Sequence, residues 1–336
     1  MPNSGAPVES FLSDNCPPMG IYETLYAFRN SFGSFMGEKG THPWSQGFPL
    51  TRQLEMFDGP PLPDEVRVTW EDRFYPKAWG HPKLRSSIVD YYNERYGSKI
   101  TPENVMVFAG GRPGIYTIMA FLKEKVRVRI GSIEWPAYLD ILTQTDTEYE
   151  TVPFTKENGF RPKNSEYFDR AKIDDGTFIM PVISNPQNPS GQTRHGPELR
   201  DLIEMAEKPG NGLLLDEAYE MFHSPSVSGI EFVKDLDNSN IFLAGACTKG
   251  LQSPGIRIGW VIASKKNIET MANYSSFGMG GVSHPSQHYA VELLEPNRVR
   301  RARKAVELHY NWQRNRYGQA FAVSYTHLRA HETAFY

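Results

Sequence analysis

Cysteine is scarce in this sequence, where Cys16 and Cys247 are the only two among 336 residues. Cys16 lies in an N-terminal stretch rich in Pro, Ser, Gly and Asn, and Cys247 ends an apolar run, so a framework of disulfide bonds is not expected. Free thiols are typical of a reducing compartment. We therefore expect a cytoplasmic protein.

Long apolar runs are missing as well. No stretch approaches the ~20 apolar residues that span a bilayer, and the opening residues MPNSGAPVES lack the basic start and the apolar core of a signal peptide. We expect a soluble protein that is not exported.

An excess of charge of either sign is also absent, because 36 basic residues nearly balance 39 acidic ones and leave a net charge of −3. Such a chain has no strong field to attract nucleic acid or an anionic membrane. We expect small molecules and further copies of the chain as partners. With 39% hydrophobic and 22% charged residues, the composition is globular, and the length allows about two domains.

Short apolar segments alternate with helical patterns beyond residue 80. Strands are expected over 105–110, 126–132, 177–184, 212–218, 241–247 and 256–263. Helices are expected over 82–97, near 115–122 and 199–205, and over 297–319. Buried strands that alternate with helices predict an α/β/α fold with a mostly parallel sheet covered on both faces. Ligands of such sheets bind at the carboxyl ends of strands.

Charged residues occur at three of these strand ends. Lys249 follows the strand over 241–247, where an amine can be desolvated and acquire the lowered pKa that Schiff-base chemistry requires. Arg257 lies where the chain re-enters the sheet and could bind a phosphate through two parallel hydrogen bonds. Asp216 ends the run GLLLD and could keep a pyridine nitrogen protonated. A solvated surface lysine and a structural ion pair are the alternatives for Lys249 and Arg257.

Two turns at strand ends could add ligands. In SNPQNPSG (184–191), the amide of Asn188 could donate to a phenolate oxygen, although a plain turn needs no function. AGGRPG (109–114) opens a helix whose backbone N–H groups could bind an anion, but it lacks the spacing of nucleotide-binding loops. Trp135 could stack on an aromatic cofactor or belong to the core.

His284 and His288 are four residues apart, as in a helical metal-binding pair. Neither a carboxylate nor a third ligand has a recognisable spacing to them, so we expect no metal site.

The motifs NPQNPSG, DEAY and TKG with PGIRIGW follow one another with separations of 28 residues from Asn188 to Asp216, 33 from Asp216 to Lys249 and eight from Lys249 to Arg257. This ordered set resembles the class I/II aminotransferases of pyridoxal-5′-phosphate (PLP) fold type I. The resemblance extends over roughly residues 44–294. It implies a three-layer α/β/α large domain with a mostly parallel seven-stranded sheet, and a small domain.

The resemblance also implies roles for individual residues. Lys249 would form the Schiff base with PLP and move protons, and Asp216 would pair with the pyridine nitrogen. Asn188 and Tyr219 would bind the phenolate oxygen, with Tyr219 and Asp216 counted among the catalytic residues and Asn188 also close to the substrate. Trp135 would stack on the ring.

Other implied roles concern the phosphate and the substrate. The phosphate would be held by Gly111, Arg112, Thr248 and Arg257. Tyr75 would reach the phosphate site of a neighbouring subunit, which implies a homodimer with shared active sites. Gly47 would lie beside the substrate carboxylate. Two departures concern the phosphate site: Ala246 stands where the family often has serine, and Arg112 and Pro113 stand where small or polar residues are commoner.

The function implied is transfer of an amino group from an α-amino acid to a keto acid. A PLP-dependent carbon–sulfur or other β-eliminating lyase is the alternative, since the same residues serve both reactions. A PLP-binding sensor domain without catalytic activity would need an N-terminal DNA-binding module, for which the first 40 residues are too short and too weakly basic.

The expected domains follow from the same resemblance. Residues 1–55 would form an arm and a small-domain segment, 56–296 the PLP-binding large domain, and 297–322 the start of an incomplete C-terminal small domain. In the family this domain supplies an arginine for the substrate carboxylate. The tail 323–336 contains VSYTHLRAHET, which looks like translated sequencing-adapter DNA. A divergent natural tail is the alternative, and sequencing of the source locus distinguishes the two.

Overall fold

The computed structural model describes residues 20–36, 38–41, 47, 49–171 and 176–332, and only the backbone of Ile21 and of 324–332. Most of the N-terminal arm and the end of the adapter-like tail therefore lie outside the described residues. The proposed domain boundaries and the origin of the tail stay predictions. Among the described residues, no helix combines the length and apolar character needed to cross a membrane.

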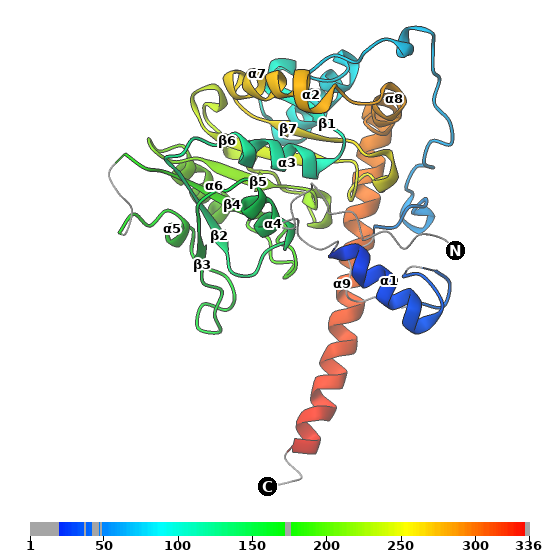
Figure 1. Cartoon of the computed structure of the whole chain (residues 1–336). Coiled ribbons are helices and arrows are strands. Elements are labelled where there is room, and N and C mark those ends of the chain that lie inside the picture. The colour runs from blue at the N-terminus through cyan, green and yellow to red at the C-terminus, as the bar shows by residue number, and fades with distance from the viewer. Residues whose placement is uncertain (1–19, 37, 42–46, 48, 172–175, 333–336) are drawn as a thin grey trace, which may run out of the picture.

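A seven-stranded sheet forms the centre of the molecule (Figure 1). Its strands are β1 Val105–Phe108, β2 Val126–Gly131, β3 Tyr149–Val152, β4 Phe178–Ser184, β5 Leu213–Asp216, β6 Ile241–Ala246 and β7 Gly259–Ile262. Their order is β1-β7-β6-β5-β4-β2-β3. Only β7 runs antiparallel to its neighbours β1 and β6, while the remaining pairs are parallel. The predicted mostly parallel sheet is confirmed.

The expected strands all form, and the seventh strand, β3, is one that the apolar pattern missed. Its sequence is YETV and only Val152 is buried. β3 lies at one edge of the sheet and pairs with β2 alone. An edge strand can keep polar side chains in solvent, so it lacks the continuous apolar run by which the buried strands were recognised.

Helices surround the sheet. They are α1 Ile21–Phe32, α2 Pro82–Tyr96, α3 Gly111–Ala120, α4 Ala137–Gln144, α5 Asn164–Tyr167, α6 Gly196–Ala206, α7 Lys265–Tyr274, α8 His284–Leu293 and α9 Pro296–Glu332. The predicted stop of α2 is confirmed, because Gly97 adopts a left-handed conformation with φ +66°. The first part of α9 packs on the core, and the rest of this helix extends away from the sheet (Figure 1).

Alternate residues of β1, β4, β5, β6 and β7 enter two separate cores, which confirms the three layers. In β5, Leu213 and Leu215 contribute to one core, whereas Leu214 contributes to the other. The first core contains residues of α2, α6, α8 and α9, and the second contains residues of α3, α4 and α7. The two-residue period of a strand thus divides its apolar side chains between the helical layers.

Two buried carboxylates fix the loop that follows β5. Glu220 accepts hydrogen bonds from the hydroxyls of Tyr91, Tyr92 and Tyr96 on α2. Glu217 accepts from Ser228 Oγ and from a backbone N–H of the next loop, both at 2.6 Å. Burial raises the pKa of Glu220, an effect that the tyrosine hydrogen bonds oppose. These contacts connect the chain after Asp216 to the helical layer.

We expect Glu220→Ala to destabilise the protein by about 3 kcal/mol or more, because three buried hydroxyls lose their acceptor. Glu220→Gln keeps an acceptor oxygen and should cost less. Glu204→Ala is the matched control, since the Glu204 carboxylate is exposed and binds only the exposed amine of Lys234 at 2.9 Å among its described contacts. Urea unfolding measures the free energies of unfolding. Equal losses in the Glu220→Ala and Glu204→Ala variants would contradict the structural role of Glu220.

Candidate active site

Lys249 lies in the turn after β6, and the fold brings it beside two of the residues expected at the site. Its Nζ donates to the carbonyl oxygen of Gly47 and lies 5.2 Å from the centre of the Tyr219 ring. A Cβ at Gly47 would be 3.2 Å from the Tyr219 hydroxyl. Burial lowers the pKa of Lys249, although nearby Asp216 opposes this effect. The neutral amine that attacks a carbonyl is therefore easier to form.

Asp216 is the last residue of β5, and its carboxylate is held by two hydrogen bonds. Tyr138 donates its hydroxyl to Oδ2 at 2.7 Å, and the backbone N–H of Ala218 donates to Oδ1 at 3.0 Å. Burial raises the pKa of Asp216, while both hydrogen bonds and the charge of Lys249 act to lower it. These two hydrogen bonds and Lys249 thus stabilise the ionised form of Asp216, whereas burial alone would disfavour it.

Tyr138 is a residue of this site that the sequence analysis missed. It lies three residues after Trp135, and the two rings meet edge to face with their centres 5.2 Å apart. A tyrosine in an apolar helix is usually expected to be a core residue. Its sequence neighbours do not indicate that it would contact Asp216, which is 78 residues away in the chain. The spacing of three in WPAY places both rings on one side of a helical turn. That spacing was the only available signal.

The glycine turn between β1 and α3 meets the turn that precedes β7. Gly110 has φ +106°, and a Cβ there would lie 2.4 Å from Nη2 of Arg257. A Cβ at Gly259 would lie 2.4 Å from the backbone nitrogen of Gly111. Both distances are too short for a real Cβ, so each position requires glycine. The guanidinium and the N-terminus of α3 therefore lie side by side, which is a suitable arrangement for an anion.

Arg257 has an unusual backbone for a residue that is not glycine. Its φ of +53° and ψ of +54° are left-handed, and its Nη1 donates to the carbonyl oxygen of Pro254 at 2.7 Å. Such a conformation costs free energy and persists where the surrounding structure holds it. Thr248 is half-buried in the turn after β6. Ala246 adjoins the glycine turn, because its Cβ would be 3.6 Å from a Cβ at Gly111.

Arg112 and Trp135 are brought together, with the guanidinium carbon 5.0 Å from the centre of the indole ring. This is the distance of a cation–π contact. The side chain expected to bind phosphate thus contacts the side chain expected to stack on the cofactor. Their expected roles towards PLP stay predictions.

The turn that carries Asn188 begins beside Asp216, since Ser184 pairs with Asp216 in the register of β4 and β5. The backbone N–H of Asn188 donates to Ser184 Oγ at 2.9 Å, and this hydroxyl donates to Glu134 at 2.7 Å. Burial raises the pKa of Glu134 to about 8. Glu134 is a second residue that the sequence analysis missed. Tyr75, by contrast, is 95% exposed in the single chain.

The residues at the strand ends have the chemistry that PLP requires. An amine with a lowered pKa suits its carbonyl, and a hydrogen-bonded acid suits its ring nitrogen. The missing Cβ of Gly110 leaves the space that the Arg257 guanidinium occupies beside the start of α3. A phosphate bound there would meet both a cation and helix N–H groups.

Known proteins resemble this chain in sequence and in fold. The model of the family "Aminotransferase class I and II" matches residues 67–335. An aspartate aminotransferase of Pyrococcus horikoshii is 28% identical over 242 residues, which are 72% of this chain and 61% of that protein. A 1-aminocyclopropane-1-carboxylate synthase of Malus domestica is 28% identical over 238 residues, 66% of this chain and 50% of that protein.

A solved structure, the aspartate aminotransferase from Thermus thermophilus with maleate, superposes with a TM-score of 0.64 at 24% identity. The match covers 73% of this chain and 63% of that one, and it supports the fold. The chain thus spans between half and two thirds of the length of these relatives. Because the family model matches most of the sequence, the chain belongs to the class I and II aminotransferase family, whose members depend on pyridoxal 5′-phosphate.

Proposed function

We propose that this chain is the cofactor-binding part of an aminotransferase that moves an amino group from an α-amino acid to a keto acid. The proposal rests on one observation above all. Lys249, with its lowered pKa, lies within electrostatic reach of Asp216 and beside Tyr219 at the carboxyl ends of β5 and β6. When bound, PLP supplies a carbonyl and an electron-withdrawing ring at this place.

The residues of the candidate active site have distinct tasks in this proposal. Lys249 would hold the cofactor through Nζ, and its amine would take a proton from the substrate Cα and return one. Asp216 keeps a proton on the ring nitrogen, and Tyr138 fixes the orientation of its carboxylate. Asn188 and Tyr219 bind the phenolate oxygen.

The phosphate of the cofactor is assigned to the glycine turn between β1 and α3 and to the residues around it. Gly111, Arg112, Thr248 and Arg257 bind it, with Gly110 providing the space for the guanidinium. Trp135 stacks on the ring, and Gly47 and Asn188 adjoin the substrate.

A β-eliminating or carbon–sulfur lyase is the second candidate. Its support is the 28% identity to a 1-aminocyclopropane-1-carboxylate synthase, a relative that is not named an aminotransferase. The residues named above serve both reactions, because the outcome depends on which bond to Cα is perpendicular to the cofactor ring. Assays of amino transfer and of pyruvate release distinguish the two.

We also infer that two copies of the chain pair, with Tyr75 reaching the phosphate site of the partner. In the single chain Trp70, Phe74 and Tyr75 are 65%, 63% and 95% exposed. Three large aromatic side chains in one short segment are typical of a protein interface. Location in the cytoplasm stays a prediction.

The full-length protein should develop a visible absorbance band with PLP and transfer amino groups between amino acids and keto acids. Lys249→Ala should lose the band and reduce the transfer rate by about 10²- to 10⁴-fold or more, because the proton-transferring amine is gone. Lys266→Ala, at an exposed position of α7, is the matched control. A band that survives Lys249→Ala overturns the assignment. Pyruvate and ammonia from cysteine-like substrates, without amino transfer, favour the lyase.

Tyr138→Phe should weaken PLP binding by about tenfold or more, since a hydrogen bond to a charged group is lost. The hydroxyl lowers the pKa of Asp216, so its removal raises that pKa. The ionised acid is then lost at a higher pH as the pH falls, and the acid limb of the kcat/KM profile moves to higher pH. Tyr149→Phe on the edge strand β3 is the control. An unmoved limb would argue against a positioning role for Tyr138.

Mixed dimers test the shared site. Tyr75→Ala and Lys249→Ala subunits should each be poorly active alone, but co-refolded mixtures should regain activity. In a mixed dimer, one of the two sites then combines an intact Lys249 with an intact Tyr75 from the other subunit. Activity in the mixture no higher than the average of the two variants would contradict the exchange of Tyr75.

A further inference from the structure

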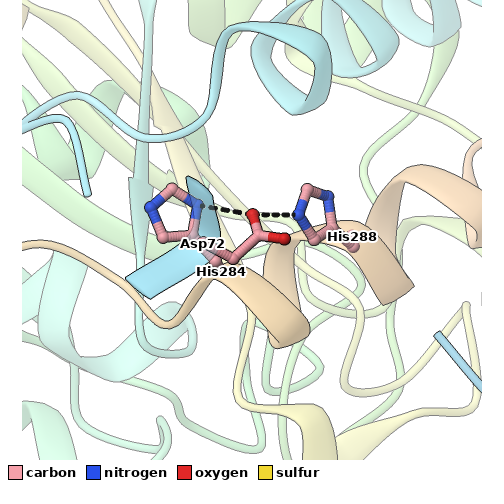
Figure 2. A group of neighbouring side chains, drawn as sticks. All are labelled: Asp72, His284 and His288. Atoms are coloured by element: carbon pink, nitrogen blue, oxygen red, sulfur yellow. Dashed lines mark hydrogen bonds and ion pairs between the residues drawn. The ribbon is translucent and has the colours of Figure 1, made fainter. Parts of the chain in front are cut away.

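A group of side chains that could bind a metal ion lies outside the candidate active site. Asp72 comes from the short helix Glu71–Arg73, and His284 and His288 come from α8. The carboxylate lies between the two imidazoles (Figure 2). Asp72 Oδ1 is 2.7 Å from Nε2 of His288 and 3.7 Å from Nδ1 of His284. One ligand atom from each of the three residues lies within 4.8 Å of the others.

The local structure orients the Asp72 carboxylate and the two imidazoles towards one another. Residues four apart on a helix share a face, so the first turns of α8 present both imidazoles together. Thr69 donates its backbone N–H to Asp72 Oδ2 at 2.7 Å and its hydroxyl to the same oxygen at 3.1 Å. Oδ2 is thereby occupied and Oδ1 is left for the histidines. Such outer hydrogen bonds orient the carboxylates of metal sites.

An ion pair between Asp72 and His288 accounts for only part of this cluster. Nδ1 of His284 is buried, and among the described residues it has no hydrogen-bond partner. At 3.7 Å the Asp72 oxygen is too distant to serve as one. Buried polar nitrogens are nearly always paired, so an unpaired one needs an explanation. A bound cation would satisfy His284 and His288 at once.

We propose that Asp72, His284 and His288 bind a divalent transition-metal ion, with Zn²⁺ as the best match. Zinc binds imidazole nitrogen at about 2.0–2.1 Å and carboxylate oxygen at about 2.0–2.2 Å, and two histidines with one carboxylate form a known ligand set for it. Tetrahedral bonds of that length place neighbouring ligand atoms about 3.3 Å apart. The present separations of 2.7 and 3.7 Å lie on either side of that value. A zinc ion on these ligands would widen the first separation and shorten the second.

The chemistry of the ligands selects among ions. Mg²⁺ and Ca²⁺ prefer oxygen ligands only, so two imidazoles disfavour them. Three protein ligands leave a fourth position of a tetrahedral ion for water or another side chain. His81 is a candidate, because its ring centre is 5.1 Å from that of His288 and 6.0 Å from that of His284. Its Nδ1 accepts from the backbone N–H of Lys83 at 3.2 Å, so Nε2 would be the ligand atom.

The site would have a structural effect of its own. Asp72 precedes the exposed Tyr75 by three residues, and α8 belongs to the first core. An ion on these ligands fastens the segment that carries Tyr75 to the sheet through α8. Gln287 already makes a related link, since its Oε1 accepts from the backbone N–H of His81 at 2.5 Å. The site requires nothing of Lys249 or of PLP.

The experiment is a metal titration of the full-length protein after dialysis against a chelator. Zn²⁺ is measured by competition with a chromophoric chelator, and Co²⁺ reports the coordination geometry through its visible spectrum. We expect one ion per chain. His284→Ala, His288→Ala and Asp72→Asn should each lower the affinity by about 100-fold or more, because a ligand change exceeds the 10- to 100-fold effect of an outer contact.

His195→Ala is the matched control. His195 and His223 are also a histidine pair, with ring centres 5.0 Å apart, but no carboxylate completes a three-ligand group with them in the part of the chain that the structure describes. This variant should bind zinc like the wild type. Circular dichroism and the PLP band establish that each variant is folded. A folded wild type without stoichiometric zinc, or ligand variants that keep the wild-type affinity, would overturn the proposal and leave the PLP assignment untouched.

Discussion

The direction of the strands is the constraint on which the site depends. Because β4, β5 and β6 run parallel, their carboxyl ends lie at one edge of the sheet. Asp216, the last residue of β5, and Asn188 and Lys249, which follow β4 and β6, therefore emerge at that edge. β7 runs the opposite way, so its beginning, and not its end, lies at that edge. Gly259 therefore pairs with Ala246 of β6 and with Phe108 of β1. This single reversal brings Arg257 to the glycine turn.

A second constraint is the free energy that is required to keep ionised groups buried at this edge of the sheet. Burial disfavours the ionised forms of both Asp216 and Lys249, and each residue partly relieves the other. The hydroxyl of Tyr138 and the Ala218 N–H further support the acid. The polar residues behind them, Glu134 and Ser184, connect the Asn188 turn to the same strand ends. The chemistry of the candidate site thus depends on the charges of Asp216 and Lys249 and on the buried hydrogen bonds around them.

Much of this could be predicted from sequence, and the failures have physical reasons. The buried strands were recognised because they are continuous apolar runs, whereas the edge strand β3 is half polar. Lys249, Asp216 and Arg257 belong to local motifs with fixed spacing. Tyr138 and Glu220 act through partners that only the folded chain brings near. The expectation of no metal rested on local spacing and stays untested. The carboxylate of the proposed site could not have been found in that way, because Asp72 lies 216 residues before His288 and reaches α8 through the packing of the loop ahead of α2.

The left-handed backbone of Arg257 has a consequence for how this protein can change over generations. Glycine would adopt φ +53° without strain, so the backbone alone favours the loss of the side chain at this position. Within the chain the guanidinium donates to the Pro254 carbonyl oxygen, and an anion is the partner that would match its charge. If Arg257 binds an anion as proposed, backbone strain and ligand binding favour different residues at this position, and a substitution that relieves the strain would weaken the binding.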